Sequence, residues 1–120
     1  MYRLLVVAGM LAILAAPAAA AQDTHRVSKT EVTFTTPVVV GTTTLAPGRY
    51  RFECRMIDGQ HVMVVIQKGK EMARVPCTPT ALDSKVNETG YRTMTRGEER
   101  VLTEIRINGE SIAHRLVPTP

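Results

Sequence analysis

The sequence predicts an all-β protein, folded as a single-domain antiparallel β-sandwich or flattened barrel of about eight strands. After the Pro47-Gly48 turn, apolar residues occupy every second position from Tyr50 to Met56, and charged residues fill the positions between them. This period of two is typical of a strand with one buried face. Turn residues also interrupt β-rich runs about every 8–12 positions, and no segment after residue 21 has helical periodicity.

Residues 1–21 have the three parts of a secretory signal peptide. Arg3 supplies a positive start, an uncharged apolar run extends from Leu4 to Ala16, and alanines at 18–21 are suited to cleavage. The run is shorter than the ~20 residues that span a bilayer. We therefore expect cleavage after Ala20 or Ala21, with an uncleaved anchor as the alternative. Residues 22–120 would then form one exported domain, periplasmic or extracellular, without a transmembrane span.

The first expected strand covers residues 26–36, where Thr, Val and Phe favour extended structure. Pro37 ends it, because proline cannot donate to a strand ladder. Two short strands follow around the Gly41-Thr42 turn. They are expected at residues 38–40 and 43–45, ahead of the alternating strand at 50–56.

Asp58-Gly59 predicts the first hairpin of a meander. We expect a three-residue loop over 58–60, which pairs Cys54 with Val64 and sets apolar residues against one another on one face. A two-residue loop, which pairs Cys54 with Met63, is the alternative. The choice decides which residues of the returning strand share the inward face with Cys54.

Cys54 and Cys77 are predicted to be either a disulfide or two buried thiols. The next hairpin is expected to pair Ile66 with Glu71 across a two-residue loop and to continue in step. In a flat sheet this register separates the cysteines by roughly 17 Å, at ~3.4 Å per residue and ~4.8 Å per strand. A disulfide needs Cα atoms within about 7 Å. It therefore requires Pro76 to bend the chain and carry Cys77 to another layer.

The segment 76–90 is rich in proline and polar residues and is predicted to be a loop crossing between two sheets. Asn108-Gly109 is the strongest hairpin signal in the chain. A two-residue turn there pairs Ile105 with Ile112 and puts His114 on the inward face, where we expect a packed residue. After residue 90, strands are expected at 91–94 and 100–107, followed by a last strand that Pro118 ends.

Composition and motifs exclude several function classes. The chain has a formal net charge of +4 and no basic run, so nucleic-acid binding is not expected. Its serines lack a glycine elbow, no histidine has a catalytic setting, and no phosphate-binding loop is present. We therefore expect no enzyme and no cofactor. The predicted function is an exported, non-enzymatic binding or structural β module of the cell envelope or periplasm.

A periplasmic copper-binding protein is the alternative function. His61 and Met63 share one strand face, and Cys54, Cys77 and further methionines add soft ligands that suit copper. Against this hypothesis, the expected register puts His61 and Met63 on the face opposite Cys54. Single methionines on strands also commonly fill gaps in a core.

The outward-facing arginines form a second candidate site. Arg51, Arg55, Arg106 and Arg115 could present a cationic face to an acidic envelope component or to another protein. The alternative is that these charges keep the sheet soluble and protect it from aggregation. No particular partner is indicated by this pattern.

Three segments follow a shared pattern: a Pro-Val strand at 37–40 that leads to Leu45 and the turn before Tyr50, the run 64–69, and a late hairpin from Leu102 to Gly109. Together they resemble small exported bacterial β-proteins of unassigned function, which carry an L-P-A-G-x-Y turn-strand and an L-x-E-I-x-x-x-G hairpin. In this chain the turn reads Ala-Pro-Gly. The resemblance implies export and an all-β fold, and it implies no catalytic residues.

Overall fold

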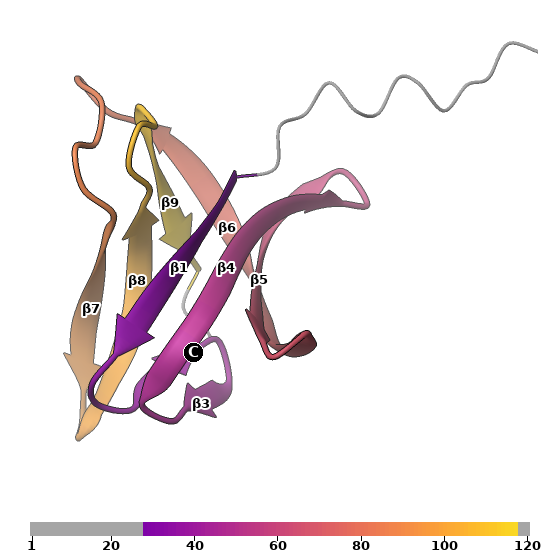
Figure 1. Ribbon diagram of the computed structural model, residues 1–120, viewed down its shortest axis with the longest axis vertical. Helices are drawn as coiled ribbons and strands as arrows, with labels where there is room; N and C mark the ends of the chain where they lie inside the picture. Colours follow the sequence, from indigo (N-terminus) through magenta and orange to yellow (C-terminus); the bar gives the residue numbers. More distant parts are fainter. Residues whose placement is uncertain (1–27, 118–120) are drawn as a thin grey trace, which may run out of the picture.

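The computed structural model describes residues 28–117, and all regular structure in that range is β (Figure 1). The predicted all-β class is therefore confirmed, while the predicted signal peptide at 1–21 lies outside the described residues. No helix in the described range could cross a membrane. The nine strands found there are β1 (Ser28–Phe34), β2 (Val38–Val40), β3 (Thr43–Leu45), β4 (Gly48–Ile57), β5 (Gln60–Gln67), β6 (Lys70–Ala81), β7 (Gly90–Arg96), β8 (Glu99–Arg106) and β9 (Ile112–Leu116).

The strands form one continuous sheet in the order β1-β4-β5-β6-β9-β8-β2-β3, with β7 paired to β8. The path does not close, so β1 and β3 are its two ends. All pairings are antiparallel except the short one between β2 and β8, where Val39 lies opposite Val101. The consecutive hairpins expected from the turn signals account for most of this antiparallel order.

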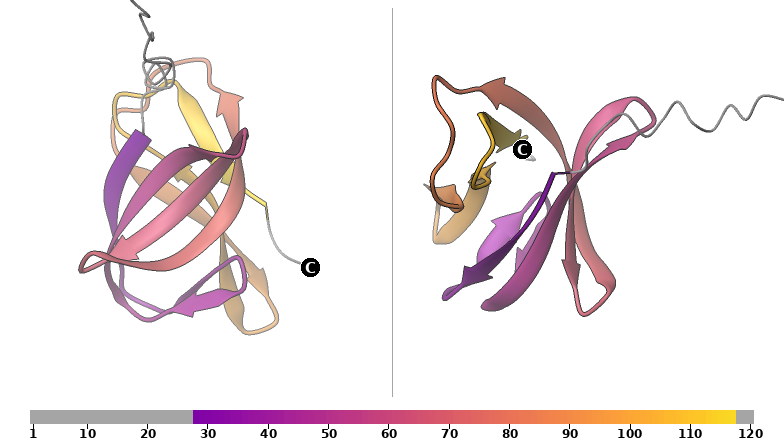
Figure 2. Two further views of the ribbon diagram at one scale, coloured as in Figure 1. Left: turned by 90° about the vertical axis from the view of Figure 1, so that its right-hand side faces the viewer. Right: turned by 45° about the horizontal axis from the view of Figure 1, so that its top comes forward.

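Strand β6 connects the two halves of the sheet. Its residues from Lys70 to Pro76 pair with β5, and its residues from Cys77 to Ala81 pair with β9. Figure 2 shows β6 running from the half that holds β1, β4 and β5 to the half that holds β8 and β9. The expected loop over 76–90 is therefore wrong for 76–81, which are strand, and right for 82–89. Pro76 is tolerated where β6 changes partner strands, because the hydrogen bonds of the two neighbouring ladders can form without the N–H that proline lacks.

One apolar core lies between the two halves and takes side chains from both. Phe34 is one of its buried residues: its ring is 6.0 Å from that of Phe52 and 5.0 Å from that of Tyr91, both edge to face. The Tyr91 contact joins β1 to β7, two strands that share no ladder. Thr30 and Thr89 also approach there, with their hydroxyl oxygens 3.4 Å apart. Side chains thus connect two strand edges that backbone hydrogen bonds leave separate.

The β4–β5 hairpin has the two-residue turn, so the expected three-residue loop is wrong. Asp58 and Gly59 have φ of 51° and 77°, and Cys54 lies opposite Met63. Positive φ at both central residues is the type I′ turn that suits the twist of a hairpin. Pairing apolar residues across the hairpin could not identify the register, because all four residues from Val62 to Val65 are buried and both faces of β5 are apolar. Met56, expected inside, is 48% exposed near the hairpin end.

The β5–β6 hairpin begins as expected, with Ile66 opposite Glu71. A bulge then follows, since Val65 pairs with Ala73 and leaves Met72 as the extra residue of β6. The expected pairing of Val64 with Ala73 is therefore wrong by one position. The bulge keeps the apolar residues of β6 facing the core while it shifts their partners.

The β8–β9 connection is longer than the expected two-residue turn, and Ile105 pairs with His114 instead of Ile112. The loop is held from outside the hairpin: the Gly109 N–H donates to the Val86 carbonyl at 2.8 Å. A second bond runs from the Val86 N–H to the carbonyl of Glu110 at 2.9 Å. A shift of two residues preserves the inward face of a strand, so His114 still points into the core.

Candidate metal centre

Three potential metal ligands from three strands meet in the core. Cys54 lies on β4, Cys77 on β6 and His114 on β9, and all three are buried. The two sulfur atoms are 3.6 Å apart. The sulfurs and one ring nitrogen of His114 all lie within 4.8 Å of one another. This spacing lets a small movement bring the three atoms around one ion, since metal–sulfur and metal–nitrogen bonds are about 2.0–2.3 Å long.

The path of β6 explains why the three residues meet. Cys77 is the first residue of β6 that pairs with β9, and it lies opposite Leu116. His114 is two residues away on the same face of β9. The roughly 17 Å expected between Cys54 and Cys77 is wrong for two reasons. The observed register puts Val75 in the row of Cys54, so Cys77 is two residues along the strands from Cys54 instead of four. The sheet also bends where β6 changes partners after Pro76. Both cysteines are free thiols in this structure.

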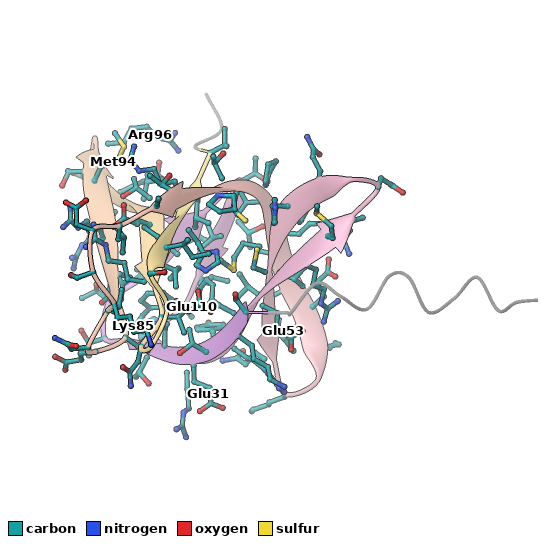
Figure 3. The ribbon with its side chains drawn as sticks, turned by 90° about the horizontal axis from the view of Figure 1, so that it is seen from above. Glu31, Glu53, Lys85, Met94, Arg96 and Glu110 are labelled. Carbon is teal, nitrogen blue, oxygen red and sulfur yellow. The ribbon has the colours of Figure 1, made fainter. Side chains whose placement is uncertain are left out.

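Glu110 orients the imidazole of His114. Nε2 of His114 lies 2.8 Å from Oε1 of Glu110, so the carboxylate accepts a hydrogen bond from the Nε2–H. Nδ1 of the same ring is buried and makes no hydrogen bond. A carboxylate that holds one ring nitrogen and leaves the other free is the usual support of a metal-binding histidine. Glu110 is in the loop before β9, and Figure 3 labels it together with Glu53 of β4.

The electrostatics of the cluster favour one thiolate. The hydrogen bond from Cys77, together with smaller effects of His114 and His61, lowers the pKa of Cys54 to about 4 against the opposing effect of burial. The hydrogen bond to Cys54, together with burial, raises the pKa of Cys77. Burial acts to lower the pKa of His114, but interactions with Cys54 and Glu110 outweigh it and raise that pKa. A thiolate is the form of cysteine that binds metals.

His61 and Met63 of β5 lie on the same face of the sheet as Cys54 of β4. The expectation that they occupy the opposite face is therefore wrong. Nδ1 of half-buried His61 is 3.7 Å from the Cys54 sulfur. Met63 is fully buried and lies directly opposite Cys54 in the ladder. The two-residue turn causes both changes, since a one-residue shift moves every side chain to the other face.

The arginines expected on one face belong to two clusters. On β4, Arg51 and Arg55 both bind Glu53, with N–O distances of 3.1 and 2.7 Å. On the other half of the sheet, Arg106 binds the buried Glu104 at 2.6 Å, and Arg115 lies 3.6 Å from it. Each cluster therefore contains a carboxylate that offsets part of its positive charge.

Sequence reasoning missed the carboxylates Glu53 and Glu104 and three further members of these groups. Arg92 of β7 joins the second cluster at 3.5 Å from Glu104, a contact that depends on the β7–β8 register. His114 was expected only as a packed residue, and Glu110 carried no expectation. A histidine on an otherwise apolar inward face of a strand, with a carboxylate four residues before it, is the signal that could have identified this pair.

Searches with protein-family models, curated proteins and solved structures find no match to this chain. The fold and the cluster therefore define its class by themselves. Across residues 28–117 it is an all-β chain in a single bent sheet, with two thiols and an imidazole buried together in the core.

Proposed function

We propose that this chain is an exported, non-enzymatic β module that binds a soft metal ion, Cu(I) foremost, through Cys54, Cys77 and His114. The observation that carries the proposal is the approach of two sulfurs and a ring nitrogen to within 4.8 Å in the core. Thiolate and imidazole ligands bind copper and zinc in preference to hard cations such as Mg²⁺ and Ca²⁺. Burial of all three residues also shields a bound ion from water.

The number of ligands favours Cu(I) over Zn(II). Structural zinc sites almost always use four protein ligands in a tetrahedron. The cluster supplies three, and His61 is a further candidate, with Nδ1 3.7 Å from the Cys54 sulfur. Two sulfurs and one nitrogen suit a soft monovalent ion without His61. His61 is therefore the residue that separates the two metals.

The test is a Cu(I) titration of the reduced protein in competition with a chromophoric chelator, with native mass spectrometry to count bound ions. One Cu(I) per chain is expected. Cys54→Ser, Cys77→Ser and His114→Ala should each lower the affinity by more than the roughly 10–100-fold that loss of an outer-shell partner costs. Met94→Leu is the matched control, because its thioether is exposed at the far end of β7 (Figure 3). No binding, or equal binding by all variants, would refute the proposal.

A parallel titration with Zn(II) identifies the preferred ion. His61→Ala should lower Cu(I) affinity far less than His114→Ala does and should weaken Zn(II) strongly, since zinc needs the fourth ligand. If His61→Ala weakens Cu(I) as strongly as His114→Ala does, the site has four ligands and the assignment of Cu(I) to three residues is wrong.

The proposal includes export and a finer description of the fold. The three-part pattern of residues 1–21 supports export, which the intact mass of protein from the exported fraction would test by its new N-terminus. The single hydrogen-bonded path through β6 supports an open, flattened barrel over a sandwich of two separate sheets. An intact mass that retains residues 1–21 would argue against cleavage.

Binding of an acidic envelope component through the arginines is supported less well. Glu53 and Glu104 each offset one positive charge in their cluster. The two clusters also lie on different halves of the sheet, so the arginines do not form one continuous face. We therefore assign the arginines a role in the stability and solubility of the sheet.

A further inference from the structure

The Cys54 and Cys77 sulfurs are close enough to react with each other as well as to share an ion. Their separation is 3.6 Å, and a disulfide requires about 2.05 Å. The remaining approach is roughly 1.5 Å, which side-chain rotation can supply in part. The two residues come from strands that are separated by β5 in the sheet, so a bond between them would cross-link the bend of the sheet.

The two cysteines differ in the side chains that lie beside their sulfur atoms. Both thiols are buried, but Cys54 borders His61, which is only half-buried. Cys77 itself is 6% exposed and Cys54 3%, so the two thiols differ in the side chains beside them and not in their depth. A reagent as small as hydrogen peroxide can therefore reach Cys54 past the His61 imidazole, whereas a bulky disulfide reagent would need the strands to separate.

We infer that Cys54 and Cys77 form a reversible disulfide on oxidation by hydrogen peroxide, and that this disulfide and a bound metal ion exclude each other. The exclusion rests on the proposed metal-binding function, but the disulfide does not. Both states use the same two sulfur atoms, and a disulfide sulfur lacks the thiolate charge that binds the metal. Oxidation would thus remove two of the three ligands at once.

The chemistry balances with peroxide as the two-electron oxidant. The Cys54 thiolate attacks one peroxide oxygen, the O–O bond breaks, and Cys54 becomes a sulfenic acid while hydroxide leaves and takes up a proton as water. The Cys77 sulfur then attacks the Cys54 sulfur, and the S–O bond breaks. The departing hydroxide combines with the Cys77 proton as a second water. Two thiols and one peroxide give one disulfide and two waters.

The test of the disulfide uses reduced, metal-free protein and counts thiols that N-ethylmaleimide alkylates after denaturation, a readout that methionine oxidation does not affect. With peroxide, the count should fall from two to zero in the monomer and return to two with dithiothreitol. Peptide mapping should link Cys54 to Cys77. Two remaining thiols, a dimer linked between chains, or irreversible sulfinic acid would overturn the inference.

Variants identify the cysteine that peroxide oxidises first. In Cys77→Ser, dimedone should trap a sulfenic acid on Cys54, whereas wild type should give little adduct because Cys77 consumes it. In Cys54→Ser, Cys77 should react much more slowly, since the half-buried His61 imidazole lies beside the Cys54 sulfur. Equal labelling in both variants would contradict the assignment of Cys54. The wild-type thiol count remains decisive if either variant fails to fold.

A final arm tests the exclusion with Ag(I), a soft monovalent ion that does not cycle with peroxide. Protein loaded with Ag(I) should keep its thiols under peroxide, and oxidised protein should bind no Ag(I) until it is reduced. If reduced protein binds no metal but forms the disulfide, the metal function fails and the disulfide stands. If reduced protein binds metal but forms no disulfide, this inference fails and the proposed function stands.

Discussion

Nε2 of His114 lies 2.8 Å from Oε1 of Glu110, and this contact determines which nitrogen of a buried imidazole is available in the core. In the neutral ring the Nε2–H is occupied by Glu110, so the lone pair belongs to Nδ1, which makes no hydrogen bond. Glu110 is four residues before His114 in the chain. The loop that carries it is held by its hydrogen bonds to Val86, so the orientation depends on a segment outside the β8–β9 pair.

Glu110 should therefore support metal binding without touching the ion. Glu110→Ala is expected to lower metal affinity by roughly 10–100-fold, the usual cost of losing an outer-shell partner. Glu110→Gln should lose less, because its amide oxygen still accepts from Nε2–H. Chelator competition measures both, with the exposed Glu98→Gln as control. If Glu110→Ala binds as wild type does, Glu110 plays no part in the site.

The thiolate at Cys54 should depend on the Cys77 thiol. The hydrogen bond from Cys77 is the largest cause of the lowered Cys54 pKa of about 4. In metal-free Cys77→Ala the donor is absent, so the Cys54 pKa should rise toward 9.0. Cys77→Ser keeps a hydroxyl donor and should raise it less. Thiolate absorbance followed against pH measures the shift; a Cys54 pKa that stays low in Cys77→Ala would contradict this account.

Met63 should act as core packing, and the thioether should not bind the metal. It is fully buried among the apolar residues of the core cluster. Met63→Leu conserves volume and should cost less than about 1.5 kcal/mol of unfolding free energy. Cu(I) affinity should be unchanged, as measured by chelator competition. A loss of affinity by about tenfold or more would make Met63 a participant in the site.

Gly59 should stabilise the β4–β5 hairpin through its backbone conformation alone. Its φ is +77°, and a Cβ added there would meet no atom within 4 Å. Gly59→Ala should therefore cost about 1–2 kcal/mol, the penalty of a left-handed conformation for an L-residue. Gly90→Ala is the matched control, because Gly90 is equally uncrowded and its φ is not positive. Urea unfolding compares the two; equal stabilities would show that the turn tolerates a side chain.

Glu104 should stabilise its half of the sheet more than an exposed carboxylate does. It is buried and accepts the 2.6 Å contact from Arg106, with Arg92 and Arg115 also within reach. Glu104→Gln should cost about 1–3 kcal/mol, since charged hydrogen bonds in a buried position are lost. Glu71→Gln, which breaks the exposed pair with Arg74, should leave the unfolding midpoint unchanged. Equal effects on thermal unfolding would refute the distinction.

Much of the strand pattern could be predicted because it is written in local sequence. The alternation from Tyr50 to Cys54 became the buried face of β4, and short strands formed at the predicted positions around Gly41. A strand needs only its own residues to define an inward face, and a turn needs only a few residues with suitable backbone preferences.

Register was harder to predict, because it depends on what covers each strand. β5 is buried on both faces, so its sequence could not choose between two loops that differ by one residue. The bulge at Met72 and the long β8–β9 loop have the same origin. Their pairings satisfy contacts with other parts of the chain, such as Val86, and no local signal records those contacts.

The sequence by itself determined the fold class, the positions of the main turns and the inward direction of Cys54, Cys77 and His114. Only the tertiary structure decided that these residues meet, because the meeting depends on the bend of β6 at Pro76 and on its change of partner from β5 to β9. A flat sheet with the same strands would keep the two cysteines far apart. Side-chain direction is a local property of a strand, whereas the distance between two strands is a property of the whole sheet.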